Sequence, residues 1–342
     1  MNVANLDHIR NGLLEKRQTI TGWLKGTPPD KRQNLWGPGG EKAIQETLQT
    51  LDTALEKTDN QTLDICTVCG GHIEAELLEM DYTSSVCLGE YSPEELHNLE
   101  TELRLAQVVQ RGLLPQQLPE IPGLELAVYS RPSQIVGGDY FDFVQFRDGS
   151  YGLALADIAG HGVSASLLMA TIQTALRTLA PNNDSPAAVL KEINHLFVRN
   201  INFTTFVTMF LGAFNPHTHT LTYSNAGHNP PLYVHRQDGS PQAHTWLPPT
   251  GPAIGIVENY PSSENSLSLS PGDVLMFYTD GVTEATDPHM SPFGQERLAA
   301  IICREPRQPV HNLVQLVRQG MDEFTMGQPL ADDTTIIALS VA

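Results

Sequence analysis

From about residue 123 to its end, the chain alternates between short apolar runs bounded by turn residues and pairs of helical segments. Such runs are typical of β-strands, and apolar side chains at helical spacing mark the segments between them. The strand-like runs are LELAVYSRP, YGLALADIAG, FVTMFLGAFNP, LTYSNAGHN, PPLYVHRQ, DVLMFYTDG and TTIIALSVA. The helical segments are VSASLLMATIQTALRTLA, SPAAVLKEINHLFVRNI, FGQERLAAIIC and PVHNLVQLVRQGMDEF. Strands in blocks with paired helices between them favour an α+β layered sandwich over a regular βαβ repeat.

The preceding part of the chain divides into three segments. Residues 1–60 are predicted to be a helical lead-in, because helical periodicity occurs twice around a break rich in proline and glycine. Residues 61–91 are turn-rich and hold three of the four cysteines, and residues 92–116 form a linker helix. Residues 117–342 then make the larger domain.

The linker helix has clear boundary signals. Ser92 is expected as the N-cap, Pro93 occupies the first helical position, Glu95 completes a capping box, and Pro115 stops the helix. Its apolar stripe resembles a short coiled-coil seam, with the intervening core position taken by Gln110: Leu96, Leu99, Leu103, Ala106 and Leu113. Two interpretations stay open, a homodimer through residues 92–115 and a helix packed on its own domain.

Composition excludes several classes of partner. With 20 Lys+Arg against 39 Asp+Glu, the formal charge of -19 opposes binding to nucleic acid or to anionic lipid. No segment approaches the roughly 20 apolar residues that span a bilayer, and the first residues lack the order of a signal peptide. We therefore expect a cytoplasmic protein that binds neither membranes nor nucleic acid.

Aspartates follow or precede the predicted strands beside small residues. They occur as GGD at Asp139, ADIAGHG at Asp157, FYTDG at Asp280 and ADDTT at Asp332 and Asp333. Each motif alone also fits an ordinary turn or strand entry. Together, carboxylates at strand ends can converge on one side of a sheet, and oxygen ligands suit a hard cation such as Mg²⁺ or Mn²⁺.

The stretch IVGGDYFDF places two carboxylates in an apolar setting. A carboxylate removed from water needs a compensating partner, so we expect a cationic group near Asp139. Asp142, two aromatics further on, is expected to face solvent.

The ordered motifs VGGDYFDF, ADIAGHGVSASLLMA, SNAGHNPPLY, GDVLMFYTDGVTEA and DDTT resemble the metal-dependent serine/threonine phosphatases of the PPM class, in their SpoIIE-like or RsbU-like branch. The resemblance runs from about residue 110 to the C-terminus. It implies an α-β-β-α phosphatase sandwich and a centre of two Mn²⁺ or Mg²⁺ ions. Asp157 resembles the carboxylate that bridges both metals, and the Ile158 carbonyl resembles a ligand of one of them. Asp280 and Asp332 resemble the carboxylates on the other metal, and Asp139 resembles the one acting through a bound water.

Some assignments within this resemblance stay open. Asp333 could replace Asp332, although Asp332 is favoured. His161 and His228 are candidates for the general acid, because a histidine titrates near neutral pH, and both also fit a structural turn residue. The general acid is left unassigned, with His161 as the candidate.

The resemblance implies a reaction and a substrate class. Water activated by two metals attacks phosphoserine or phosphothreonine on a regulatory protein, which in bacterial members is commonly an anti-sigma-factor antagonist. The alternative is a non-catalytic phosphoprotein-binding scaffold with the same fold. Such decay usually removes metal carboxylates, and here all the matching aspartates are present.

The cysteine segment CTVCGGHIEAELLEMDYTSSVCLGE resembles a degenerate zinc finger of the DksA/TraR type. Cys66, Cys69 and Cys87 occupy three ligand positions, and Glu90 stands at the fourth. Glu90 or the nearby His72 could complete a tetrahedral Zn²⁺ site, and a finger that folds without metal is the alternative.

Overall fold

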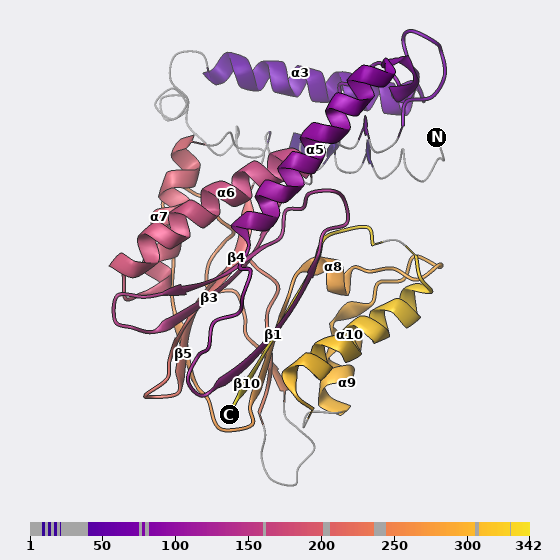
Figure 1. Cartoon of the computed structure of the whole chain (residues 1–342). Helices are drawn as coiled ribbons and strands as arrows, with labels where there is room; N and C mark the ends of the chain where they lie inside the picture. Colours follow the sequence, from indigo (N-terminus) through magenta and orange to yellow (C-terminus); the bar gives the residue numbers. More distant parts are fainter. Residues whose placement is uncertain are drawn as a thin grey trace. The chain divides into compact units, whose positions relative to one another are not determined.

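The computed structural model describes residues 9–10, 13–14, 17–18, 21, 40–74, 77–78, 82–159, 162–200, 206–235, 244–304, 308–328 and 330–342. The chain divides into two compact units, and the division falls between Leu103 and Arg104. Figure 1 gives the order of the elements along the chain. No helix among these residues is both long and apolar enough to cross a bilayer.

The first unit contains helix α3 (Gly40–Asp59) and the short 3-10 helix η1 (Leu88–Glu90). One hydrophobic cluster joins described residues of the N-terminal segment and α3 to the cysteine segment, including Leu13, Leu51, Leu63, Cys66 and Cys87. The cysteine segment is therefore packed against helical residues from the lead-in.

Helix α5 (Pro93–Leu113) begins and ends as its sequence signals predict. The Ser92 backbone N–H donates to Glu95 Oε2 over 2.8 Å, and the Glu95 N–H donates to Ser92 Oγ over 3.2 Å. This reciprocal pair is a capping box, and it satisfies backbone donors that the first helical turn leaves unpaired.

The second unit contains two five-stranded sheets in which every strand pairing is antiparallel. One sheet has the order β1-β10-β9-β6-β7, and the other has the order β2-β3-β4-β5-β8. The strands are β1 (Leu124–Arg131), β2 (Tyr140–Gln145), β3 (Tyr151–Ile158), β4 (Val207–Asn215), β5 (Thr220–Ala226), β6 (Leu232–Val234), β7 (His244–Trp246), β8 (Asn265–Ser268), β9 (Val274–Tyr278) and β10 (Thr334–Val341).

Helices cover the outer face of each sheet, as Figure 1 shows. Helices α6 (Gly162–Leu179) and α7 (Pro186–Asn200) pack on the β2–β5 sheet, with the short η2 (Ala180–Asn182) between them. Helices α9 (Gly294–Arg304) and α10 (Val310–Thr325) pack on the other sheet, and the short α8 (Asp280–Thr283) follows β9.

Three hydrophobic clusters fill the spaces between these four layers, and strand periodicity explains them. In β10, Ile336 and Ala338 face the α9/α10 layer, whereas Ile337 and Leu339 face the opposite sheet. Successive strand side chains point to opposite faces, so a strand in a middle layer must be apolar on both. The predicted α-β-β-α sandwich is confirmed.

Candidate metal centre

The aspartates predicted from the sequence come together at the ends of strands from both sheets. Asp139 immediately precedes β2, and Asp157 is the penultimate residue of β3. Asp280 begins α8, with Thr279 between it and β9, and Asp332 and Asp333 directly precede β10. Sandwich packing therefore gathers carboxylates that are far apart in sequence.

Burial and the charges of neighbouring acidic groups raise the pKa values of three of these carboxylates. Burial, and then the negative charges of Asp157 and Asp333, raise the pKa of the Asp139 carboxyl well above its usual range. Burial raises the pKa of Asp157 in the same way, with further contributions from Asp280 and Asp332. The pKa of Asp280 is also raised, by burial and then by Glu284. A cluster of like charges withdrawn from water favours a bound cation.

Asp139 is held by hydroxyl groups, and no ion pair to it occurs among the described residues. Its Oδ2 accepts hydrogen bonds from Thr279 Oγ1 over 2.8 Å and from Thr335 Oγ1 over 2.7 Å. Its Oδ1 is buried without a hydrogen-bond partner in the described part of the chain. A buried carboxylate oxygen is costly unless paired, so this atom suits a metal ion or a metal-bound water.

The two adjacent aspartates before β10 have different environments. Asp333 is buried, and its carboxylate accepts hydrogen bonds from the backbone N–H groups of Ser133 and Gly138 and from the Ser133 hydroxyl. Asp332 is exposed, and its Oδ1 accepts from the Asp333 N–H over 2.7 Å. The Asp333 carboxylate thus holds the loop that leads to Asp139.

Two positions in these motifs require glycine, because atoms of Asp333 lie very close to their Cα atoms. A Cβ on Gly137 would lie 2.3 Å from Asp333 Oδ2, and a Cβ on Gly281 would lie 2.0 Å from the Asp333 carbonyl oxygen. Neither position can accept a side chain without displacement of its neighbours.

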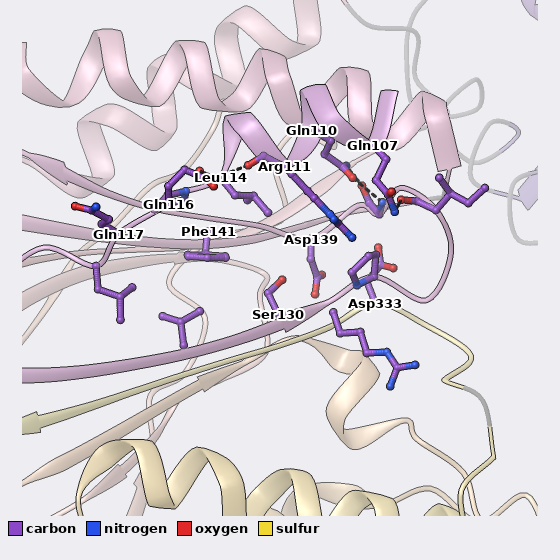
Figure 2. A pocket seen from close by; sticks show the side chains of 17 residues that line it. Gln107, Gln110, Arg111, Leu114, Gln116, Gln117, Ser130, Asp139, Phe141 and Asp333 are labelled. Atoms are coloured by element: carbon purple, nitrogen blue, oxygen red, sulfur yellow. Dashed lines mark hydrogen bonds between the residues drawn. The ribbon is translucent and has the colours of Figure 1, made fainter. Parts of the chain in front are cut away.

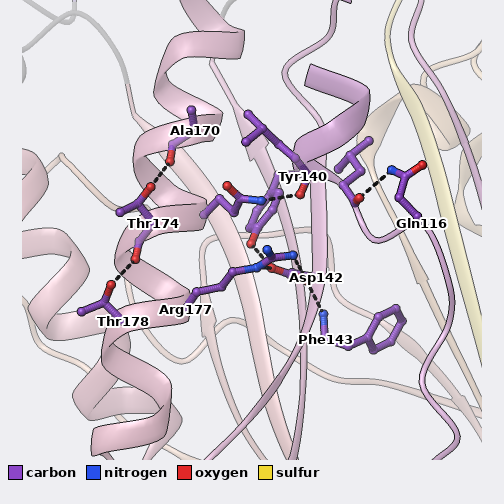
Figure 3. Close-up of polar contacts among 11 residues, drawn as sticks. Gln116, Tyr140, Asp142, Phe143, Ala170, Thr174, Arg177 and Thr178 are labelled. Atoms are coloured by element: carbon purple, nitrogen blue, oxygen red, sulfur yellow. Dashed lines mark hydrogen bonds and ion pairs between the residues drawn. The ribbon is translucent and has the colours of Figure 1, made fainter. Parts of the chain in front are cut away.

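The expectation that Asp142 faces solvent is wrong. Its side chain is 1% exposed and accepts hydrogen bonds from Arg177 Nε over 2.7 Å and Arg177 Nη2 over 3.1 Å. The Tyr140 hydroxyl and the Phe143 N–H also donate to it, as Figure 3 shows. Arg177 therefore pairs with Asp142, and no cationic side chain among the described residues binds Asp139, three residues earlier.

Of the two candidate histidines, His161 and His228, the structure describes only His228. His161 lies outside the described residues. His228 is buried, its Nδ1 lies 2.8 Å from Thr208 Oγ1, and its backbone is held by the Asn225 side chain. Burial lowers the pKa of His228 to about 3, so a neutral, structural histidine fits this position.

Sequence reasoning also missed side chains that support the cluster. Thr279 and Thr335 bind Asp139, and Gln110 of α5 binds the backbone of Gly137. Glu284, at the end of α8, adds to the negative charge around Asp157 and Asp280. The Thr-Asp-Gly and Asp-Asp-Thr-Thr strings contained the threonines, but only the pairing of β9 with β10 directs both hydroxyls at Asp139.

The three cysteines of the first unit are also close together. The sulfur atoms of Cys66, Cys69 and Cys87 all lie within 4.8 Å of one another. Among the described residues, they form the group of three potential metal ligands found within that distance. No three of the described aspartates form such a group.

A solved structure with the same architecture is the SiaA-PP2C domain of Pseudomonas aeruginosa, which is 25% identical and superposes with a TM-score of 0.63. The match covers 72% of this chain and 98% of that domain. The RsbU and RsbW domains of Rv1364c from Mycobacterium tuberculosis match with a TM-score of 0.56 at 24% identity, covering 67% of this chain and 63% of that one. The fold is that of the PP2C phosphatase domains.

Comparison with related sequences identifies the family to which the chain belongs. Residues 147–342 match the family Stage II sporulation protein E (SpoIIE). Phosphoserine phosphatase RsbU of Bacillus subtilis is 30% identical over 244 residues, which cover 70% of each chain. Phosphoserine phosphatase RsbP of the same organism is 26% identical over 248 residues, covering 71% of this chain and 59% of RsbP. The chain belongs to the SpoIIE family, and it is a protein serine/threonine phosphatase.

Proposed function

We propose that Asp139, Asp157, Asp280 and Asp332, with the Ile158 carbonyl, hold two Mn²⁺ or Mg²⁺ ions at which phosphoserine or phosphothreonine is hydrolysed. The observation that carries this proposal is the gathering of carboxylates whose pKa values are raised by burial and by one another. The same proposal is supported by one atom, Asp139 Oδ1, which is buried and has no hydrogen-bond partner among the described residues. Oxygen donors without sulfur or nitrogen are the set that Mg²⁺ and Mn²⁺ prefer.

The roles of the residues follow from their positions. When bound, a pair of such ions supplies a nucleophile from water at neutral pH and neutralises charge on the phosphoryl oxygens. The Thr279 and Thr335 hydroxyls orient Asp139, and Asp333 holds the loop around Ser133 and Gly138. His161 stays the candidate for the general acid.

For the substrate we propose a phosphorylated regulatory protein, an anti-sigma-factor antagonist. RsbU and RsbP carry the name phosphoserine phosphatase, and a domain called RsbU is joined to an RsbW domain in Rv1364c. These similarities support a protein substrate in a regulatory pathway. A cytoplasmic location is part of the same proposal.

Calorimetric titration with Mn²⁺ tests the metal centre without relying on activity. Wild-type protein is expected to bind two ions, and Asp157→Asn is expected to lose most of that binding. Asp322→Asn, an exposed aspartate on α10, is the matched control and should bind like the wild type. Wild-type binding by Asp157→Asn would contradict the assignment.

The cysteine cluster supports a Zn²⁺ ion in the first unit, which we add to the proposal. The backbone N–H groups of Cys69 and Cys87 lower the pKa of Cys66 to about 6, which favours the thiolate that zinc requires. The Gly71 N–H lowers the pKa of Cys69, but the Cys87 and Cys66 sulfurs, with Glu90, raise it to about 11. Glu90 stays the proposed fourth ligand, since carboxylates also bind zinc.

The alternative fourth ligand, His72, has its Nδ1 2.7 Å from Asp64 Oδ2 and is not part of the three-sulfur cluster. Elemental analysis of full-length protein purified without chelator is expected to give one zinc per chain. Cys69→Ser should lose the zinc, and Cys303→Ser should keep it. Zinc absent from the wild type would refute this part of the proposal.

The last part of the proposal is a homodimer in which two chains pair through α5. Gln110 is buried and Leu113 packs against the core of its own domain, so the C-terminal part of the predicted seam is already occupied. The apolar side chains left exposed on the helix are Leu99, Leu105, Val108 and Val109. If α5 dimerises, light scattering should show a dimer that Leu105→Glu/Val109→Glu converts to a monomer.

A further inference from the structure

Gln110 binds both backbone polar groups of Gly137, in the loop that leads to Asp139. Its Nε2 donates to the Gly137 carbonyl over 2.6 Å, and its Oε1 accepts from the Gly137 N–H over 3.1 Å. The side chain is 8% exposed, so water does not compete freely for these bonds. Figure 2 shows Gln110 above Asp139, with the two hydrogen bonds drawn.

A second glutamine lies one helical turn earlier and reaches the same loop. Gln107 Nε2 donates to the Ile135 carbonyl over 3.0 Å, in an exposed position. Residues three apart on a helix lie on one face, so both glutamine side chains can reach this loop. The helix therefore binds the loop at two points, of which only Gln110 is buried.

The opposite side of the loop is held by Asp333. Its carboxylate accepts from the N–H groups of Ser133 and Gly138, so it holds the start of the loop and the peptide unit that joins Gly137 to Gly138. Gly137 itself lies too close to Asp333 for any side chain. Removing Gln110 would leave the Gly137 N–H and carbonyl groups, which Asp333 does not bind, without these hydrogen bonds.

The loop and the threonines together fix Asp139. The threonine hydroxyls set the position of Oδ2, and the held backbone sets the position of Cα, so Oδ1 can point in one direction only. Without the Gln110 bonds the backbone could shift while the threonine bonds remain. Oδ1 would then leave the position in which the cation needs it.

We propose that Gln110 is a positioning residue of the phosphatase, which acts on metal binding through the Gly137 backbone and Asp139. The proposal rests on the proposed metal centre. Partners that orient a metal ligand typically change metal affinity or activity 10–100-fold when removed. Loss of the Gln110 amide should therefore weaken metal activation more than it changes folding.

The test compares Gln110→Leu, which keeps the approximate size and loses both hydrogen bonds, with Gln107→Leu as the matched control. The measured quantities are the Mn²⁺ concentration for half-maximal hydrolysis of p-nitrophenyl phosphate, kcat at saturating Mn²⁺, and Tm of the metal-free protein. For Gln110→Leu we expect a half-activating concentration raised about tenfold or more, with partial recovery at high Mn²⁺. Gln107→Leu should change it less than threefold.

Gln110→Glu is the second variant, for use if Gln110→Leu does not fold. It keeps the acceptor for the Gly137 N–H and loses the donor to the Gly137 carbonyl, so it should also raise the half-activating concentration. A wild-type concentration in whichever variant folds would overturn the proposal. If Asp157→Asn is inactive while Gln110→Leu behaves as wild type, the positioning role fails and the metal centre stands. If Asp157→Asn is fully active, the metal centre itself fails.

Discussion

The ion pair between Asp142 and Arg177 gives a prediction about stability that does not involve the proposed metal site at Asp139. Arg177→Met removes the guanidinium and leaves a carboxylate that is 1% exposed; among the described residues, the hydrogen bonds that remain to it come from Tyr140 and Phe143. Breaking a buried ion pair typically costs 3–5 kcal/mol. The Arg177 side chain is 50% exposed, so water can partly replace it, and we expect a cost near the lower limit, about 3 kcal/mol.

Thermal and urea unfolding of the metal-free protein measure this cost. A loss of about 3 kcal/mol corresponds to a fall in Tm of about 6–12 °C for a domain of this size. The matched control is Arg147→Met, whose pair with Asp184 is exposed on both sides and should contribute at most about 1 kcal/mol.

A double variant identifies the cause. Asp142→Asn/Arg177→Met replaces the buried charge with a neutral amide, so it should be more stable than Arg177→Met alone. Neither change should alter the Mn²⁺ dependence of the folded enzyme. If Arg177→Met costs less than about 1 kcal/mol, or if the second substitution lowers stability further, the buried charge is not what the arginine stabilises.

Other predictions concern the carboxylate cluster and its surroundings. In metal-free protein at neutral pH, Asp139→Asn should raise the free energy of unfolding by about 1–2 kcal/mol in urea titrations, because it removes one of several repelling buried charges, and hydrolysis should fall sharply. Gly281→Ala should lower stability by about 1–3 kcal/mol, since its Cβ would meet the Asp333 carbonyl at 2.0 Å, and an unchanged Tm would contradict this. His228 is held neutral in the fold, with a pKa of about 3 against 6.5 when unfolded, so its contribution is complete above pH 6.5 and is lost as the pH falls toward 3. His228→Asn should flatten the acid side of the stability curve, by up to about 1.4 kcal/mol per pH unit, and an unchanged slope would exclude this cause.

Local signals predicted much of the fold. The α5 capping box involves residues three apart, and the two-sided apolar pattern of β10 needs only strand periodicity and a four-layer packing. The aspartates could be found because each stands in a short motif beside a strand end. Their gathering follows from the sandwich, which brings the ends of β3, β9 and β10 together.

Contacts between distant side chains could not be predicted in the same way. Asp142 and Arg177 are 35 residues apart, and nothing near Asp142 in the sequence shows that its strand face is covered by α6. Gln110 occupies a seam position in a helical pattern, and that pattern gives no sign that its amide binds Gly137. Both cases are buried polar groups whose partners depend on tertiary packing, which a one-dimensional pattern does not contain.

Metal-dependent hydrolysis tests the central claim most directly. The rate of phosphopeptide hydrolysis should be measured with and without Mn²⁺ for the wild type, Asp157→Asn and Asp280→Asn, with Asp322→Asn as the control. The wild type and the control should hydrolyse the peptide only with Mn²⁺, and the two centre variants should lose the activity while keeping their fold. Equal rates in the wild type, Asp157→Asn and Asp280→Asn would show that these carboxylates do not form the catalytic metal centre.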